Sequence, residues 1–285
     1  MRAQPLLAIP IWRRSDNLKF TKHLPAVVCS SALFLAFTAP AAYAQKPTPP
    51  SSEELAAITE RGILLNEYDQ AAWHASDAVQ TANPKTIDGQ RWIAKKENGK
   101  WTVVFGKLNA EKTAFEIHYE AIQQTKPQEF AVHEVTPPRP DKDFFLHASK
   151  AVDLALADFH GEKRPYNYAV LPTPLDQLFV YIYPVQTKAR VYPLGGDVRY
   201  LFSSDGGKIL EKHQLHKTII ENPTPDKAKK LAVGFHTHVL SGSPEDTDVF
   251  HVLTQDPRMP EIVATPHFVF KILVDGAITV EKTRN

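Results

Sequence analysis

The residues best suited to chemistry lie just after an apolar segment with strand character. His236 and His238 are two positions apart there, so both imidazoles are expected on the same face of the strand. Two neutral imidazoles on one face can bind Zn²⁺ when a carboxylate completes the set and water takes the fourth position. The stretch Ser243-Pro-Glu-Asp246 follows, in which Ser243 suits a helix N-cap and Asp246 the third helical position. The pattern predicts one zinc ion per chain, bound by His236, His238 and Asp246.

An H-x-H pair followed by S-x-x-D resembles the JAMM (MPN-plus) metalloproteases, a family of zinc isopeptidases. The resemblance extends over roughly residues 145–285 and implies that the two histidines and an aspartate hold the zinc. It also implies that Ser243 lies beside the metal-bound water and assists the oxyanion. The carboxylate ligand has two candidates. The S-x-x-D pattern of residue types favours Asp246, whereas the family's usual distance along the chain from the second histidine favours Asp248. Asp246 is the preferred ligand.

The family's general base is a glutamate on an earlier strand, and the corresponding segment 166–171 contains no acidic residue. Glu162, just before that strand, and Glu211, on a later hairpin, are therefore the candidates. With a base in place, the resemblance implies hydrolysis of amide or isopeptide bonds in a peptide or protein substrate. The alternative is a non-catalytic envelope module for binding or structure, with a degenerate fold of the same kind. His213 and His216, near the end of the hairpin, could approach the site, but surface or core roles are favoured.

The elements that would position these residues predict an α+β protein with two domains. Residues 53–135 are expected to form a small α+β domain with two helices and a four-stranded meander, because Asn98-Gly99 marks a hairpin. The Pro-rich segment 136–141 is predicted as a linker. Residues 142–285 are expected to form a JAMM-like mixed sheet with flanking helices. Its predicted elements are a helix at 145–159 and strands at 166–171, 177–185, 197–202, 208–215, 232–235, 261–264, 267–273 and 277–280.

The first 44 residues have the features of a signal sequence. Basic residues precede an apolar run from Leu24 to Phe37, and the small residues that follow end in Ala42-Tyr43-Ala44. Residues 45–52 are polar and Pro-rich and predict a flexible leader. Cys29, the only cysteine, lies in the apolar run, so the cleaved chain would contain no thiol. We expect a periplasmic or secreted protein with no membrane span after cleavage.

The charge of the chain argues against a nucleic-acid partner. Its 33 basic and 32 acidic residues give a formal charge of +1, and much of the basic excess lies before Ala44. A nucleic-acid-binding domain would carry a clear basic excess. The sequence therefore favours a peptide or protein as substrate or partner.

Overall fold

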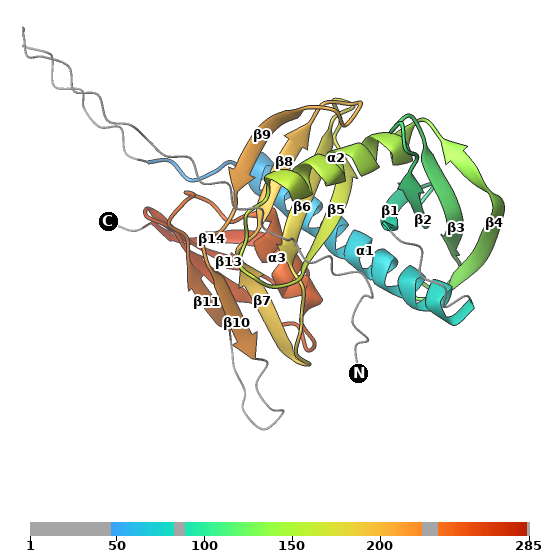
Figure 1. Ribbon diagram of the computed structural model, residues 1–285. Coiled ribbons are helices and arrows are strands. Elements are labelled where there is room, and N and C mark those ends of the chain that lie inside the picture. Colours follow the sequence, from blue (N-terminus) through green and yellow to red (C-terminus); the bar gives the residue numbers. More distant parts are fainter. Residues whose placement is uncertain (1–46, 83–88, 224–232, 284–285) are drawn as a thin grey trace, which may run out of the picture. The chain divides into compact units, whose positions relative to one another are not determined.

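The computed structural model describes residues 47–82, 89–223 and 233–283 (Figure 1). These residues form helices and mainly antiparallel sheets, which confirms the predicted α+β class. The predicted signal sequence, residues 1–44, lies outside the described residues. Among the helices of the described ranges, none combines the length and apolarity that a membrane span requires.

The N-terminal strands form one antiparallel sheet in the order β1-β2-β3-β4. Its strands are β1 (Arg91–Glu97), β2 (Lys100–Leu108), β3 (Phe115–Gln123) and β4 (Phe130–Asp141). Asn98 and Gly99 turn the chain from β1 to β2, with φ angles of 50° and 77°. Positive φ at both positions is what a tight two-residue hairpin requires, so the predicted hairpin is confirmed.

The segment 136–141 is part of β4, where the sequence predicts a linker. It pairs with β3, and Arg139 and Asp141 lie opposite Ile117 and Phe115. Its prolines are tolerated because β4 is the edge strand, so the missing N–H groups leave no partner unpaired. A strand therefore continues through the predicted domain boundary.

A single helix, α1 (Ser52–Ala82), stands where the sequence predicts two. Ser51 begins it with a capping box: the N–H of Glu54 donates to Ser51 Oγ (3.2 Å) and the Ser51 N–H to Glu54 Oε2 (2.7 Å). Gly62 allows a close crossing with α3 (Asp246–Thr254), since a Cβ there would lie 2.5 Å from Val249 Cβ. The helix contacts all four strands of the first sheet as well as α3 (Figure 1).

A second antiparallel sheet, in the order β5-β6-β8-β9, packs against α2 (Phe144–Asp158). Its strands are β5 (Tyr166–Pro172), β6 (Leu178–Pro184), β8 (Val198–Phe202) and β9 (Ile209–Gln214). Trp92 of the first sheet stacks on Tyr168 of the second, with ring centroids 4.4 Å apart. One hydrophobic core contains buried residues from both sheets, so the two predicted domains share a core.

The remaining elements form the part of the molecule that carries the histidines. Strand β7 (Val191–Gly195) pairs with β10 (Ile219–Pro223). A third sheet has the order β11 (Gly234–Thr237), β12 (Glu261–Ala264), β13 (Phe268–Ile272) and β14 (Ile278–Thr283). Strands β11 and β12 are parallel, and the other neighbours are antiparallel. A smaller core joins this sheet to α3 and to Leu55 and Ile58 at the start of α1.

Candidate metal centre

The end of β11 supplies His236 and His238, as the spacing predicts. His236 lies opposite Val263 of β12, and the N–H of His238 donates to the carbonyl of Ala264 (2.8 Å). Pairing with β12 therefore continues past the last residue of β11. Both imidazoles are buried, and their Nε2 atoms lie 3.1 Å apart, so the two rings share one face.

Helix α3 begins two residues later than the sequence predicts. Its N-cap is Glu245, whose carboxylate accepts the N–H of Asp248, while the N–H of Glu245 donates to Asp248 Oδ2 (2.7 Å). This reciprocal capping box fixes Asp248 at the third helical position, where a side chain turns back toward the helix start. Ser243 is therefore not the cap, and Asp246 takes the first helical position instead of the third.

Asp248 is the carboxylate that the structure brings to the two histidines. Its Oδ1 atom lies 3.1 Å from Nε2 of His236, and its Oδ2 atom lies 3.1 Å from Nε2 of His238. The distance along the chain from the histidines, which favours Asp248, thus indicates this carboxylate better than the S-x-x-D pattern, which favours Asp246.

Asp246, the preferred ligand of the sequence analysis, is held in a separate ion-pair network. Its carboxylate is fully buried and accepts hydrogen bonds from Arg61 Nε (2.9 Å), Tyr181 Oη (2.8 Å) and a guanidinium nitrogen of Arg199. Burial and the charge of Asp246 together raise the pKa of Tyr181 well above its ordinary value. Because two arginines already neutralise it, Asp246 serves to anchor α3 to α1, β6 and β8.

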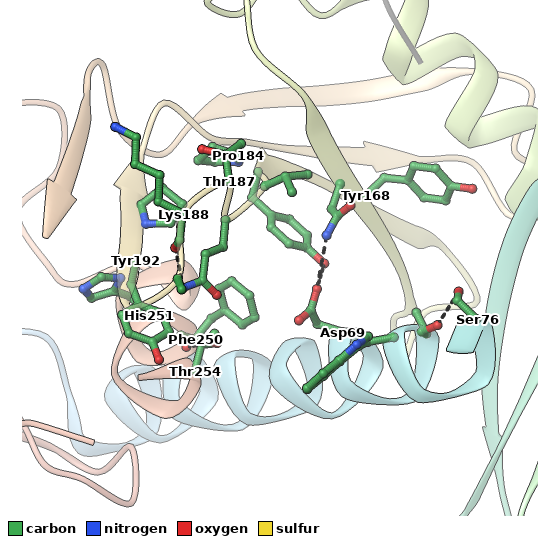
Figure 2. Close-up of a pocket in the computed structure, with 18 of the residues that line it drawn as sticks. Asp69, Ser76, Tyr168, Pro184, Thr187, Lys188, Tyr192, Phe250, His251 and Thr254 are labelled. Carbon is green, nitrogen blue, oxygen red and sulfur yellow. Dashed lines mark hydrogen bonds between the residues drawn. The ribbon is translucent and has the colours of Figure 1, made fainter. Parts of the chain in front are cut away.

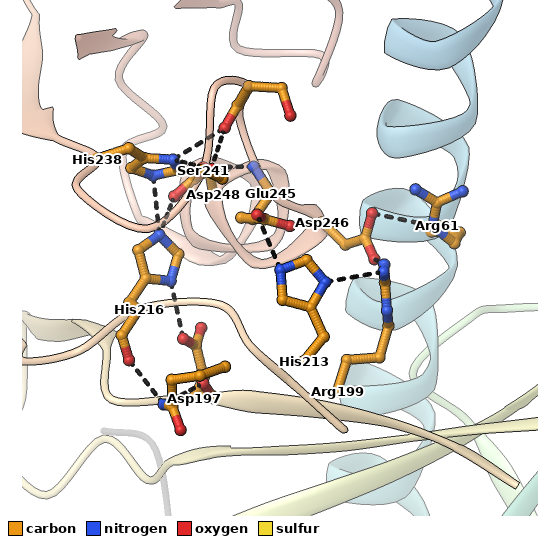
Figure 3. Close-up of polar contacts among 12 residues, drawn as sticks. Arg61, Asp197, Arg199, His213, His216, His238, Ser241, Glu245, Asp246 and Asp248 are labelled. Atoms are coloured by element: carbon orange, nitrogen blue, oxygen red, sulfur yellow. Dashed lines mark hydrogen bonds and ion pairs between the residues drawn. The ribbon is translucent and has the colours of Figure 1, made fainter. Parts of the chain in front are cut away.

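A third histidine, His216, completes the cluster from the connection between β9 and β10 (Figure 3). Its Nε2 atom lies 3.0 Å from Asp248 Oδ1 and 2.9 Å from Nε2 of His238. Its side chain is only 10% exposed. Of the two roles open to His216 from the sequence, the structure thus supports the approach to the site and not the favoured surface or core role.

The four side chains offer one ligand atom each within a very small space. The chosen nitrogen and oxygen atoms of His216, His236, His238 and Asp248 all lie within 4.8 Å of one another, and all four residues are buried. Although Asp248 Oδ1 lies close to two imidazole nitrogens, it has no hydrogen-bond partner at acceptable geometry. A buried carboxylate oxygen without a hydrogen bond is costly, and a cation among these atoms would satisfy it. The described residues could thus hold a metal ion here.

Each histidine has its other ring nitrogen, Nδ1, against a fixed oxygen acceptor. The pairs are His216 with Asp197 Oδ1 (2.7 Å), His236 with Glu261 Oε1 (2.9 Å) and His238 with the carbonyl of Ser243 (2.9 Å). An acceptor at Nδ1 places the imidazole proton there and directs the Nε2 lone pair into the cluster. This arrangement is typical of metal-binding histidines, and the acceptor also holds the ring orientation.

The charges of the cluster shift the pKa values of its members in opposite directions. Burial alone would lower the pKa of His236, but Asp248 and Glu261 outweigh burial and raise it to about 9. Asp197 and Asp248 similarly outweigh burial and raise the pKa of His216 well above its ordinary value. Burial would raise the pKa of Asp248, but the three histidines hold it well below the ordinary value. Without a metal ion, protons therefore supply the positive charge that Asp248 requires.

The other predicted catalytic residues do not converge on the cluster. Ser243 contributes its main-chain carbonyl to His238 rather than a hydroxyl group. Glu162 is exposed in the loop before β5, where its N–H donates to the Tyr166 hydroxyl (3.0 Å). Glu211 is exposed on β9. Neither glutamate belongs to the group of potential ligands found among the described residues.

A further buried acid, besides Asp197 and Glu261, lies beside the cluster. Glu245, the cap of α3, is 5% exposed, and Nε2 of His213 lies 3.6 Å from its Oε1 atom (Figure 3). Burial, followed by the nearby charges of Asp248 and Asp246, raises the pKa of Glu245 to about 8. Its carboxyl group is therefore an acid that can exchange a proton near neutral pH.

The pairing of residues across the β8–β9 hairpin could have indicated His216 as a ligand. The N–H of Leu215 donates to the carbonyl of Asp197 (3.2 Å), which places Asp197 across the hairpin from the end of β9. A histidine next to this position has a carboxylate within reach, as metal-binding histidines commonly do. This signal becomes visible only once the strands are paired.

Comparisons with known proteins give no further assignment. The chain matches no protein-family model, and neither a curated protein nor a solved structure is significantly similar to it.

Proposed function

We propose that this chain is a zinc-binding protein that holds one ion with His216, His236, His238 and Asp248. Three imidazoles and one carboxylate form a donor set that zinc commonly takes in proteins. Tetrahedral ligands at about 2.0–2.1 Å from zinc lie about 3.4 Å from one another. Five measured separations within the cluster are 2.9–3.1 Å, so a small outward shift of the side chains would accommodate the ion.

The observation that carries this proposal is that each imidazole has an oxygen acceptor at Nδ1, the ring nitrogen that faces away from the cluster. Asp197, Glu261 and the carbonyl of Ser243 hold the three Nδ1 atoms, and both carboxylates are almost completely buried. These contacts direct the three Nε2 atoms into the cluster, as the outer hydrogen bonds of metal-binding histidines commonly do. The orphaned Oδ1 atom of Asp248 supports the same proposal.

The number of protein ligands favours a structural ion in a non-catalytic module. Structural zinc sites are usually closed by four protein ligands, whereas catalytic sites usually keep one position for water or substrate. The four donors here come from the β9–β10 connection, β11 and α3. One ion would therefore tie three separate segments together. The signal-like residues 1–44 support export, and such a module would work in the periplasm or outside the cell.

A metallohydrolase is the second candidate, and Glu245 is the observation that favours it. The predicted bases Glu162 and Glu211 are exposed, but Glu245 is a buried acid with a pKa of about 8 and lies beside Asp248. Zinc supplies Lewis acidity and lowers the pKa of its bound water to about 7. Glu245 would hold and return the proton during amide hydrolysis, in keeping with the resemblance to JAMM metalloproteases. This candidate requires one of the four protein ligands to leave a position open.

The metal content of the purified full-length chain tests the zinc proposal. We expect about one zinc ion per chain, and none in the double variant His236→Ala/His238→Ala, since two of the four donors are removed. A metal-free wild-type protein after incubation with zinc would contradict the proposal.

A second measurement separates the two roles of the ion. If the ion is structural, chelation lowers the melting temperature markedly and no peptide or isopeptide substrate is cleaved. If it is catalytic, cleavage occurs, and Glu245→Gln abolishes cleavage while the zinc content stays unchanged.

A further inference from the structure

A pocket of about 460 Å³ lies between the middle of α1 and the end of α3. Helix α1 lines it with Asn66, Gln70 and Trp73, whose spacing of four and three residues places them on one face of the helix. The last residues of α3 and the segment that follows it, within 253–258, form the other wall. Ligand pockets in proteins are typically about 300–1,000 Å³, so this pocket is large enough for a small molecule.

The pocket is separate from the metal centre. None of the four candidate ligands lines it, and Gln255 follows Asp248 by seven residues, which is about 10 Å along a helix. A neighbouring cavity of about 120 Å³ shares Trp73 and Thr254 with the pocket, and Figure 2 shows Thr254 beside α1. Thr254 Oγ1 donates to Asn66 Oδ1 (3.3 Å), and this contact joins the two walls of the pocket.

Three amide side chains provide most of the polar lining, those of Asn66, Gln70 and Gln255. An amide both donates and accepts hydrogen bonds, with its groups fixed in one plane. Gln255 is 5% exposed, and its Oε1 atom has no hydrogen-bond partner among the described residues. A buried amide oxygen of this kind is usually satisfied by a ligand or by ordered water. The pocket therefore suits a ligand that donates a hydrogen bond to Gln255.

The charges of the lining favour a neutral ligand. Asp256 and Arg258 are the charged residues of the lining, and both are exposed. Arg258 Nε donates to the carbonyl of Leu253 (3.0 Å), and the N–H of Asp256 donates to the Tyr192 hydroxyl oxygen (3.1 Å). These contacts fix the segment after α3. Because the lining has one negative and one positive group, its formal charge is zero, and neither an anion nor a cation is favoured.

Trp73 and Leu253 supply the apolar part of the lining. The Trp73 ring stacks on His74, with centroids 4.5 Å apart, and this contact orients the indole. The face of an indole carries partial negative charge and attracts C–H groups that carry partial positive charge. A pyranose ring has such C–H groups on its faces and hydroxyl groups around its rim, each of which both donates and accepts hydrogen bonds. Such a ring therefore matches both the apolar and the polar part of the pocket.

We propose that this pocket binds a neutral hexopyranose, with its ring on Trp73 and Leu253 and its hydroxyl groups on Asn66, Gln70 and Gln255. One hydroxyl group donates to the buried Oε1 atom of Gln255. The lining favours a sugar over a peptide segment, because it combines amides, which pair with hydroxyl groups, with an aromatic ring, which packs against the C–H face of the sugar. A free sugar and one unit of a glycan chain share this chemistry.

Calorimetric titration of the full-length protein tests the proposal with the methyl glycosides of glucose, galactose, mannose and N-acetylglucosamine. Cyclohexylmethanol has a similar six-membered ring with one hydroxyl group and serves as the matched ligand. We expect at least one glycoside to bind saturably with a dissociation constant of about 1 mM, the order expected for a ligand of this size. It should bind at least about 10-fold more tightly than cyclohexylmethanol. No saturable binding of any of the four glycosides, or equal affinity for cyclohexylmethanol, would overturn the proposal.

Two variants test the amides. Gln255→Met keeps the length of the side chain and removes the amide, and it should weaken glycoside binding about 10-fold. It should not lower the stability to urea, because an apolar group replaces a buried oxygen that has no partner among the described residues. Gln70→Ala should weaken binding about 3- to 10-fold, whereas Gln80→Ala, on an exposed part of α1 outside the pocket, should bind like the wild type. Unchanged glycoside binding by a folded Gln255→Met protein would overturn the proposal.

Two further ligands identify the source of the bound group. Tighter binding of the trisaccharide of the bound sugar than of its methyl glycoside would assign the pocket to a glycan chain, and equal affinity would assign it to a free sugar. Tighter binding of Nα-acetyl-glutamine methylamide than of every glycoside would overturn the proposal in favour of a peptide.

Discussion

The Nε2 atom of His216 lies 3.0 Å from Oδ1 of Asp248, which joins the end of the β8–β9 hairpin to the first turn of α3. The same Oδ1 atom lies 3.1 Å from Nε2 of His236, at the end of β11. Three segments that are distant in sequence thus meet at one carboxylate oxygen. A site of this kind exists only in the folded chain, so binding of the ion would stabilise the fold directly.

Replacement of His216 by alanine should therefore weaken zinc binding at least about 100-fold, because loss of a ligand costs more than loss of an outer contact, which costs about 10–100-fold. His213→Ala is the matched control. His213 belongs to the same hairpin but faces Glu245 and Arg199. Competition with a chromophoric chelator measures both affinities. A larger loss in His213→Ala than in His216→Ala would show that the cluster is assigned wrongly.

Asp248→Asn should change zinc binding, whereas Asp246→Asn should change the stability of the fold. Asp248→Asn removes the central carboxylate and should abolish stoichiometric zinc binding. Asp246→Asn leaves Arg61 and Arg199 without their shared counter-charge, and breaking a buried ion pair in this way costs about 3 kcal/mol. We expect this variant to be less stable to urea but still to bind zinc. If both variants are fully folded and lose zinc to the same extent, Asp246 is also a zinc ligand.

Local pattern made part of this site predictable from sequence. His236 and His238 share a face because strand side chains alternate, which needs no knowledge of the fold. The choice of aspartate depended on where α3 begins. The sequence predicts a cap at Ser243 with Asp246 at the third helical position, but the capping box forms between Glu245 and Asp248, and Arg61 and Arg199 bind Asp246. The sequence places His216 near enough to approach the site but does not assign it as a ligand, because its place in the cluster depends on how the hairpin packs against α3.

The fold, too, is predictable from sequence where local patterns determine it, and is not predictable where packing between distant segments does. The hairpin at Asn98-Gly99 and helix α2 follow from local signals, and both are present. The Pro-rich segment 136–141 looks like a linker, but an edge strand accepts prolines, and edge position is a property of the whole sheet. The two helices predicted in the first domain form the single helix α1, within which Gly62 meets α3.

Gly234→Ala should weaken zinc binding by about 10–100-fold, the usual effect of disturbing a ligand's outer contact. A Cβ at Gly234 would overlap the carboxylate of Glu261, which holds Nδ1 of His236. Glu261 is buried, so its carboxylate can move only by giving up this contact. Gly242→Ala is the control, since a Cβ there meets nothing within 4 Å. Equal zinc affinities of the two variants would show that Glu261 does not position His236.

The metal-free protein should lose stability as the pH rises. The pKa of His236 is raised from 6.5 to about 9 in the folded chain, because Asp248 and Glu261 outweigh the effect of burial. A group with a raised pKa contributes its full stabilisation below its unfolded value and loses it as the pH passes its folded value. Urea denaturation of chelator-treated protein should therefore give a falling free energy of unfolding between about pH 6.5 and pH 9. The decrease in the free energy of unfolding should be smaller in His236→Ala. An increase over this pH range in the wild type would contradict the raised pKa of His236.

Gly62→Ala tests the crossing of α1 and α3. In an exposed helix this substitution would stabilise the protein by about 1 kcal/mol, because alanine favours the helix. Here the new Cβ would lie 2.5 Å from Val249 Cβ and 2.7 Å from the carbonyl oxygen of Asp246. Overpacking costs about 1–3 kcal/mol, so we expect a net loss of stability in urea denaturation. We also expect weaker zinc binding, because the displaced helix carries Asp248. Glu60→Ala, on the exposed side of α1, should change the stability by less than about 0.5 kcal/mol. A stabilised Gly62→Ala protein would mean that the two helices do not meet at this glycine.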